Sequence, residues 1–207
     1  MKKIIFTCIC FFVLTINLSA QRNERKGYIG LSLGSSFPVG DFKDQDLDNE
    51  DAGFAGTGLN LHLLNFGYQF GYTLGITASL FGASHPVVFD EDIDIFNDAS
   101  WSYGGLMGGL LISLPVSEKL DFDLRPMIGF VSGSSPEIKL AGFTVLEDQR
   151  GSGLCFDLGA SLRYNFSDKW YGMLDLDYFS ARPTFDDDFK QSISAINLNI
   201  GFGFRLN

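Results

Sequence analysis

The chain has 207 residues, of which 45% are hydrophobic and 14% aromatic, and it contains 24 glycines. Its formal net charge is −10 at pH 7, which argues against nucleic-acid binding because that binding depends on basic side chains that neutralise phosphates. After residue 20, no apolar run approaches the roughly 18 residues that a membrane-spanning helix needs. The length suits one domain.

Residues 1–20 have the layout of a secretory signal peptide. Lys2 and Lys3 form a positive start, residues 4–16 are apolar, and Ala20 is a small residue placed directly before the expected cut. We therefore expect residues 21–207 to form the mature domain. Loss of the two lysines leaves 13 basic residues against 25 acidic ones, a net charge of −12.

Cys155 is the one cysteine that remains in the predicted mature chain, because Cys8 and Cys10 lie in the signal peptide. No disulfide can then form within the chain. We expect the fold to depend on its strand ladder and its packing, with Cys155 as a small filler of the interior.

Eight runs of the mature chain alternate large apolar side chains with small or polar ones. Such a period of two is typical of β-strands, in which successive side chains point to opposite faces. The predicted strands cover residues 26–37, 54–63, 69–81, 101–114, 120–131, 153–164, 170–179 and 196–206.

The last run shows the pattern most clearly. Every even position from Ile196 to Leu206 is large and apolar, whereas the odd positions hold Asn, Gly and Arg. About ten residues also suffice for a tilted strand to cross a bilayer. We therefore expect the apolar face to contact lipid and the polar face to line the interior.

The predicted connections alternate strictly between long and short. Residues 64–68, 115–119 and 165–169 form the short ones, and residues 38–53, 82–100, 132–152 and 180–191 form the long ones. This order predicts an all-β fold, an eight-stranded antiparallel up-and-down transmembrane β-barrel, with long loops outside the cell and both termini in the periplasm. A soluble lipocalin-like barrel is the alternative, with its apolar face turned inward.

Pro38-x-Gly40-Asp41-Phe42 resembles a motif that often follows the first strand of small bacterial outer-membrane β-barrel proteins. The layout is similar to the eight-stranded transmembrane domain of outer-membrane protein A, with no peptidoglycan-binding domain after it. The resemblance implies a place in the cell outer membrane. It also implies contact with membrane lipid and lipopolysaccharide, and insertion by the barrel-assembly machinery. The chain ends in Asn207, where an aromatic residue is expected.

Eight charged side chains are predicted to point into the barrel, all from its last four strands. The lumen of an eight-stranded barrel is filled by side chains, and charges buried there need partners. We expect an interior salt-bridge network, and we keep a polar pathway or gate as the alternative, with Arg125 and Arg163 as pivots. The predicted network is Asp121, Asp123, Arg125, Asp157, Arg163, Asp175, Asp177 and Arg205.

The first long loop carries closely spaced acids, and the second carries five more between Asp90 and Asp98. Oxygen ligands suit Ca²⁺ or Mg²⁺, so Asp44, Asp46, Asp48 and Glu50 form a candidate weak cation site. Their spacing is not that of an EF-hand. A solvated acidic loop is the simpler interpretation.

Catalytic residues are scarce. His62 is predicted to face the lumen and Ser84-His85 to lie on the second long loop, but no motif places a nucleophile beside a base and an orienting carboxylate. We expect no enzyme and no cofactor. The preferred function is a structural or surface-interaction role through acidic extracellular loops. The alternative is a barrel that binds or transports a small ligand, or an accessory of a secretion machine.

Overall fold

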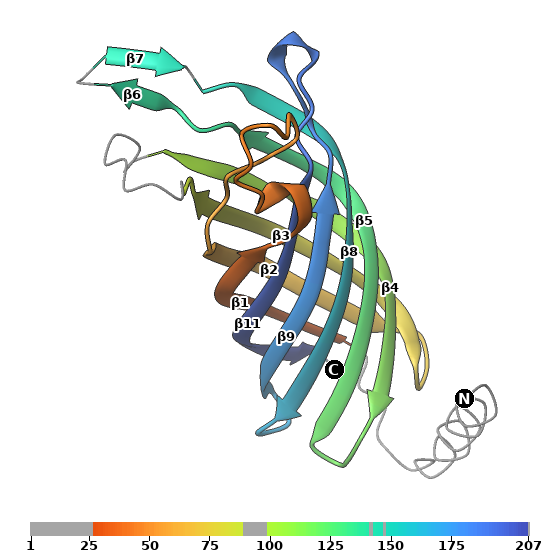
Figure 1. Ribbon diagram of the computed structural model, residues 1–207. Coiled ribbons are helices and arrows are strands. Elements are labelled where there is room, and N and C mark those ends of the chain that lie inside the picture. Colours follow the sequence, from red (N-terminus) through yellow and green to blue (C-terminus); the bar gives the residue numbers. More distant parts are fainter. Residues whose placement is uncertain (1–26, 89–98, 141–142, 147, 207) are drawn as a thin grey trace, which may run out of the picture.

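The computed structural model describes residues 27–88, 99–140, 143–146 and 148–206. The signal-peptide region and the acids from Asp90 to Asp98 lie outside these ranges. Eight long antiparallel strands form one closed sheet (Figure 1). They are β1 (Gly27–Pro38), β2 (Gly58–Gln69), β3 (Leu74–Pro86), β4 (Ser100–Pro115), β5 (Leu120–Ser134), β8 (Arg150–Asn165), β9 (Trp170–Ala181) and β11 (Ile193–Leu206).

The first and last strands close the barrel. β1 pairs with β11 along its full length, from Gly27 opposite Leu206 to Pro38 opposite Ala195. Each remaining long strand pairs with its chain neighbours, and β8 joins β5 to β9. The eight-stranded up-and-down barrel predicted from the alternating connections is confirmed.

Burial is inverted relative to a soluble protein. Phe130 and Ile200 are 72% and 71% exposed on the outer wall, whereas Arg125 and Asn199 are 1% and 0% exposed inside. Apolar side chains outside and polar ones inside are the arrangement that a bilayer requires. Aromatic side chains also gather at the short-turn end, where the rings of Trp170 and Phe204 lie 3.7 Å apart.

The described residues contain no helix with the length and hydropathy of a membrane span. Their helical elements are two single 3₁₀ turns, Gly40–Phe42 and Asp186–Asp188.

The second strand differs from its prediction because it contains a β-bulge. The register shifts between His62 and Leu64, so the inward phase changes from even positions to odd ones and Asn65 becomes buried. The predicted turn at 64–68 was wrong. β2 continues to Gln69, and the chain turns at residues 70–73 before β3 begins.

The strands also extend further than predicted at the long-loop end. β4 and β8 each have 16 residues, which at about 3.3 Å per residue and a tilt near 40° reach about 40 Å, beyond an apolar band of about 25 Å. His85, predicted on a loop, lies inside β3. The hairpin of β6 (Ile138–Leu140) and β7 (Phe143–Leu146) projects past the barrel (Figure 1). The short strand β10 (Thr184–Phe185) pairs with β8.

The first long loop, residues 39–57, folds across the mouth of the barrel (Figure 1). Gly40 has a φ of +62°, a conformation that glycine adopts without steric cost. The turn that follows carries Phe42 inward, where it is 0% exposed. The structure thus gives the Pro-x-Gly-Asp-Phe motif a packing role that the sequence did not predict.

Candidate functional site

The lumen is organised in layers. At the long-loop end, Phe42 packs edge-on against His85, Trp101 and Tyr103. Charged side chains occupy the middle. At the short-turn end, the rings of Tyr28 and Tyr171 meet at 5.5 Å, beside Leu111 and Met173. The charges therefore extend from the middle of the lumen down to the tyrosine layer at the short-turn end.

One group of charges, which we call the Arg163 cluster, comprises Ser113, Asp121, Asp123, Arg163 and Asn165. The guanidinium of Arg163 donates to both carboxylate oxygens of Asp123, at 3.0 and 3.2 Å. It also lies 3.4 Å from Asp121 and donates to the Ser113 hydroxyl. Asn165 donates to Asp121 at 2.8 Å. This two-pronged geometry is the strongest arrangement available to an arginine and a carboxylate.

Two tyrosine rings complete the surroundings of Arg163. Its guanidinium carbon lies 4.5 Å from the ring centre of Tyr28 and 5.8 Å from that of Tyr171. A cation over an aromatic face is attracted by the ring quadrupole, more strongly where water is excluded. The layer at the short-turn end is thus held by both charge and ring contacts.

The second group, the Arg125 cluster, comprises Asn65, Arg125, Asp157, Asp175 and Asp177. Arg125 reaches from β5 across the lumen to Asp175 on β9, at 3.0 Å, and to Asn65 on β2, at 3.2 Å. Asp177 lies 4.0 Å from the same guanidinium. A Cβ on Gly159 would sit 3.5 Å from both Arg125 Nε and Asp157 Oδ1, so Asp157 lies close to Arg125 as well.

Hydrogen bonding in the Arg125 cluster is incomplete. Arg125 Nε, Asp157 Oδ1, Asp175 Oδ2 and both carboxylate oxygens of Asp177 find no hydrogen-bond partner within the described part of the chain. In the Arg163 cluster the same holds only for Asn165 Oδ1. Buried polar atoms are usually paired, so the two clusters differ in kind.

The last predicted lumen charge, Arg205, lies near the end of β11. It is half-buried near the short-turn end, and its Nη1 donates to the Ser167 carbonyl at 3.4 Å. Seven of the eight predicted lumen charges thus belong to the two clusters defined above, and Arg205 contacts the turn that follows β8.

The structure does not bring the candidate cation ligands together. Asp44 accepts from the Asn49 amide at 2.7 Å and from the Asp46 backbone, and Asp46 accepts from the Asp48 backbone. Among residues whose placement is described, no three acidic, histidine or cysteine side chains form a metal-binding group. The acids from Asp44 to Glu50 form a string of turns facing solvent.

Ser84 and His85 lie next to each other in β3, so their side chains point to opposite faces of the barrel wall. His85 points inward, where Nδ1 donates to the Gly56 carbonyl and Nε2 lies 3.2 Å from the Tyr103 hydroxyl. Ser84 points outward. His62 does face the lumen as predicted, and its Nδ1 lies 2.7 Å from the Ser79 hydroxyl. The side chains of His62 and His85 are both buried.

Two residues that line the lumen were not predicted from the sequence. Asn65 was assigned to a turn, although the adjacent Leu63 and Leu64 mark the break in alternation that a bulge produces. Phe42 was assigned to an external loop. Its burial depends on contacts with residues far along the chain, such as Trp101, whose indole donates to the Gly53 carbonyl at 2.7 Å.

A family model described as outer membrane protein beta-barrel domain matches residues 6–205. The chain belongs to this family. A search of curated proteins finds no match. Membership in the outer membrane protein beta-barrel family agrees with the inverted burial described above and places the protein in the cell outer membrane.

Solved structures show the same fold. The chain is similar to Ail, the attachment invasion locus protein of Yersinia pestis, at 20% identity and a TM-score of 0.52, over 89% of this chain and 100% of that one. It is similar to Neisserial surface protein A at 7% identity and a TM-score of 0.57, over 87% and 97% of the two chains. At these identities the likeness concerns the fold alone.

Proposed function

We propose that this outer-membrane barrel is closed to ions and acts at the cell surface, where its acidic long-loop end binds cationic partners. The observation that carries the proposal is the filled lumen. Arg125 links three walls of the barrel through Asn65 and Asp175, and Phe42 fills the mouth above it.

The first loop anchors this plug at several points. Besides the bond from Trp101, Gln191 donates to the Asp51 carbonyl at 2.9 Å, and Arg182 lies 3.6 Å from the Asp51 carboxylate. The backbone of Ala55 donates to the Phe42 carbonyl. Contacts from three separate strands and loops favour a fixed plug over a mobile flap.

Charge supports a cationic partner. Residues 41–51 carry Asp41, Asp44, Asp46, Asp48, Glu50 and Asp51 against Lys43 alone. The Asn49 amide donates to the Asp44 carboxylate and lowers its pKa below the ordinary value, which keeps that carboxylate charged. Ail has been solved with the heparin analogue sucrose octasulfate, a polyanion. The acidic loop of the present chain would repel such a ligand, so a partner of the opposite charge fits it better.

Conductance tests the closed lumen. The mature protein, refolded in detergent and checked by a heat-dependent shift on a denaturing gel, should give no stable current steps in a planar bilayer. Phe42→Ala should leave the heat-dependent shift intact and still give no steps, because the two arginine clusters remain. Stable steps from the native protein would contradict the proposal and favour the alternative of a transport barrel.

Titration with a short oligolysine peptide tests the acidic surface. Asp44→Asn, Asp46→Asn, Asp48→Asn and Glu50→Gln together should weaken binding at least about ten-fold at low salt, and raised salt should weaken binding to the native protein. Asp186→Asn is the matched control, because it removes one acid from another loop. Equal affinity of the fourfold variant and the native protein would refute the role of the first loop.

A further inference from the structure

The Arg125 cluster contains more negative charge than positive charge. The guanidinium of Arg125 faces the carboxylates of Asp157, Asp175 and Asp177, and all four side chains are at most 2% exposed. The guanidinium donates to Asp175 at 3.0 Å and lies 4.0 Å from Asp177. A buried carboxylate that lacks a partner becomes neutral more readily than it stays charged. The cluster therefore requires either a second cation or the loss of a negative charge.

The strand register brings Asp157 and Asp177 together. Asp177 of β9 lies directly opposite Gly159 of β8, and Asp157 precedes Gly159 by two residues on the same inward face. Because Gly159 has no side chain, the Asp157 carboxylate extends into the space beside it, where Oδ1 lies 3.5 Å from the position of a Cβ on Gly159. Directly opposed Cβ positions are about 4.5–5.5 Å apart in an antiparallel pair. The two carboxylates thus approach each other across β8 and β9, and their charges repel.

Neighbouring strands supply no second cation to this pair within the described ranges. The other charged, titratable or polar side chains that face the pair or its arginine are Arg125 (β5), Asp175 (β9), Asn197 (β11), Cys155 (β8), Tyr28 (β1) and His62 (β2). His62 lies close to the Arg125 guanidinium, so a positive charge on its ring would be repelled. Asp157 Oδ1 and both oxygens of Asp177 have no hydrogen-bond partner among these groups.

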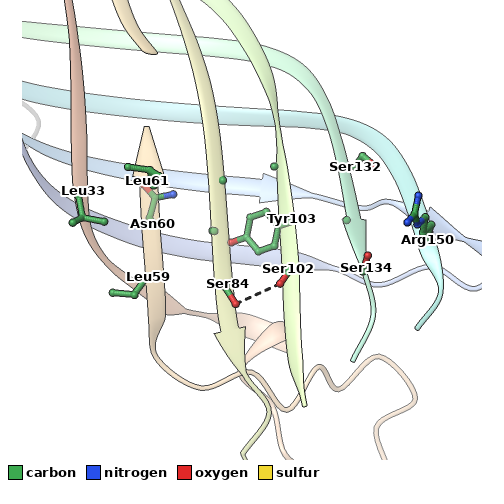
Figure 2. Close-up of a pocket in the computed structure, with 14 residues that line it drawn as sticks. Leu33, Leu59, Asn60, Leu61, Ser84, Ser102, Tyr103, Ser132, Ser134 and Arg150 are labelled. Atoms are coloured by element: carbon green, nitrogen blue, oxygen red, sulfur yellow. Dashed lines mark hydrogen bonds between the residues drawn. The ribbon is translucent and has the colours of Figure 1, made fainter. Parts of the chain in front are cut away.

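A metal group or a solvent-filled space would be another source of compensation. The three carboxylates of the Arg125 cluster do not form a metal-binding group, and no other such group occurs among the residues that the structure places. The barrel wall is hollowed near the long-loop end, with a volume of about 610 Å³ (Figure 2). Ser84, Ser102, Ser134 and Arg150 help to line this hollow, whereas no member of the Arg125 cluster does. The hollow therefore brings no solvent to the buried carboxylates.

We propose that Asp157 and Asp177 share one proton, which makes the Arg125 cluster a pH-sensitive lock inside the closed barrel. The protonated carboxyl group donates to the carboxylate beside it, so one negative charge is removed and the facing oxygens gain a partner. Loss of the proton leaves two carboxylates that repel each other across β8 and β9. The proposal goes beyond the surface role and does not depend on it, because it concerns the lumen alone.

The shared proton makes the stability of the barrel depend on pH. In the unfolded chain both aspartates are ionised above about pH 5, since the ordinary pKa of an aspartate is about 3.9. The folded barrel then binds one proton more than the unfolded chain. Its stability should therefore fall as pH rises, until the shared proton is released from the folded state.

Infrared spectroscopy tests the shared proton directly. The mature protein, prepared with isotope-labelled aspartate and refolded in detergent, should show the C=O stretch of a protonated carboxyl group at pH 7. Asp157→Asn and Asp177→Asn should each abolish this band. Asp123→Asn, which removes a carboxylate that Arg163 neutralises, is the matched control and should leave the band unchanged. Absence of the band from the native protein, or its survival in both variants of the pair, would overturn the proposal.

Urea unfolding between pH 5 and pH 9 measures the consequence for stability. The unfolding constant of the native protein should rise by up to about ten-fold per pH unit relative to that of Asp177→Asn, the slope for one proton. The ratio cancels the titration of groups that both proteins contain. Equal pH slopes for the two proteins would overturn the lock. Conductance tests the closed lumen separately, so failure here would leave the proposed function standing.

Discussion

The Arg163 cluster and the Arg125 cluster lie in adjacent layers of one lumen, yet they are built differently. Arg163 faces two carboxylates, Asp121 and Asp123, and its donors are matched to Asp123, Asp121 and Ser113. Arg125 faces three carboxylates, and four carboxylate oxygens around it have no hydrogen-bond partner within the described chain. Hydrogen bonding is nearly complete in the first cluster, and the second carries the larger excess of negative charge.

The difference matters because burial makes every unpaired charge expensive. A fully hydrogen-bonded ion pair stabilises the layer that contains it. If one partner is removed, the other charge stays buried and nothing compensates for its desolvation. An acid-rich group depends more heavily on its one arginine and less on each of its acids. Removal of the arginine should therefore destabilise the Arg125 cluster more, whereas removal of one acid should destabilise the Arg163 cluster more.

Removing each arginine should have the largest effect. Arg125→Met leaves Asp157, Asp175 and Asp177 without their guanidinium, and we expect it to lower the free energy of unfolding by at least about 3–5 kcal/mol. Arg163→Met should cost less than Arg125→Met, because Asn165 still donates to Asp121. Urea unfolding in lipid vesicles, followed by tryptophan fluorescence, measures both values.

The ranking of the two arginine variants is the informative result. Arg182→Met, which changes an exposed guanidinium outside the lumen, serves as the control for the loss of a positive charge. If Arg163→Met lowered the free energy of unfolding more than Arg125→Met, the contrast drawn between the two clusters would be wrong. The cluster with more complete hydrogen bonding would then depend more on its arginine.

Removing one acid from each cluster should have smaller and opposite effects. Asp123→Asn breaks the two-pronged contact with Arg163 and should destabilise the barrel by about 1.5–3 kcal/mol. Asp177→Asn removes one excess charge and adds an amide donor beside Asp175 and Asp157. We expect its stability at pH 7 to equal or exceed that of the native protein.

The same urea titration distinguishes the two acid variants. Asp186→Asn, on the loop after β10, controls for a general change in net charge. A loss for Asp177→Asn as large as that for Asp123→Asn would show that the Arg125 cluster is as complete as its neighbour.

The smallest effect is expected at the edge of the Arg163 cluster. The Tyr171 hydroxyl has no hydrogen-bond partner among the described residues, and it lies over Gly30 and Gly203, where a Cβ would overlap it. Tyr171→Phe keeps the ring near Arg163 and removes an unpaired polar atom. Its stability should stay within about 0.5 kcal/mol of the native value, or rise.

Tyr171→Leu is the matched comparison for the ring. It removes the aromatic face and should cost about 1 kcal/mol or more. If Tyr171→Phe proved as damaging as Tyr171→Leu, the hydroxyl would have a partner that the geometry does not reveal.

Much of the fold could be predicted from the sequence because each barrel strand carries its own two-sided pattern. The run from Leu120 to Val131 placed Asp121, Asp123 and Arg125 inward without any knowledge of neighbouring strands, and the structure agrees. Prediction failed where the pattern was locally broken. At Leu63 and Leu64 the bulge reversed the phase, so Asn65, a direct partner of Arg125, was lost from the predicted site.

The sequence by itself determined which face of each strand meets lipid, because side-chain alternation is a local property of extended backbone. It did not determine which inward charges would meet. Arg125 and Asp175 are 50 positions apart, and only closure of the barrel brings them together. The same closure sets Arg163 over Tyr28, draws Phe42 into the mouth and aligns Ser84, Ser102 and Ser134 on the outer wall. Strand register and curvature are properties of the whole sheet, so these contacts belonged to the tertiary structure alone.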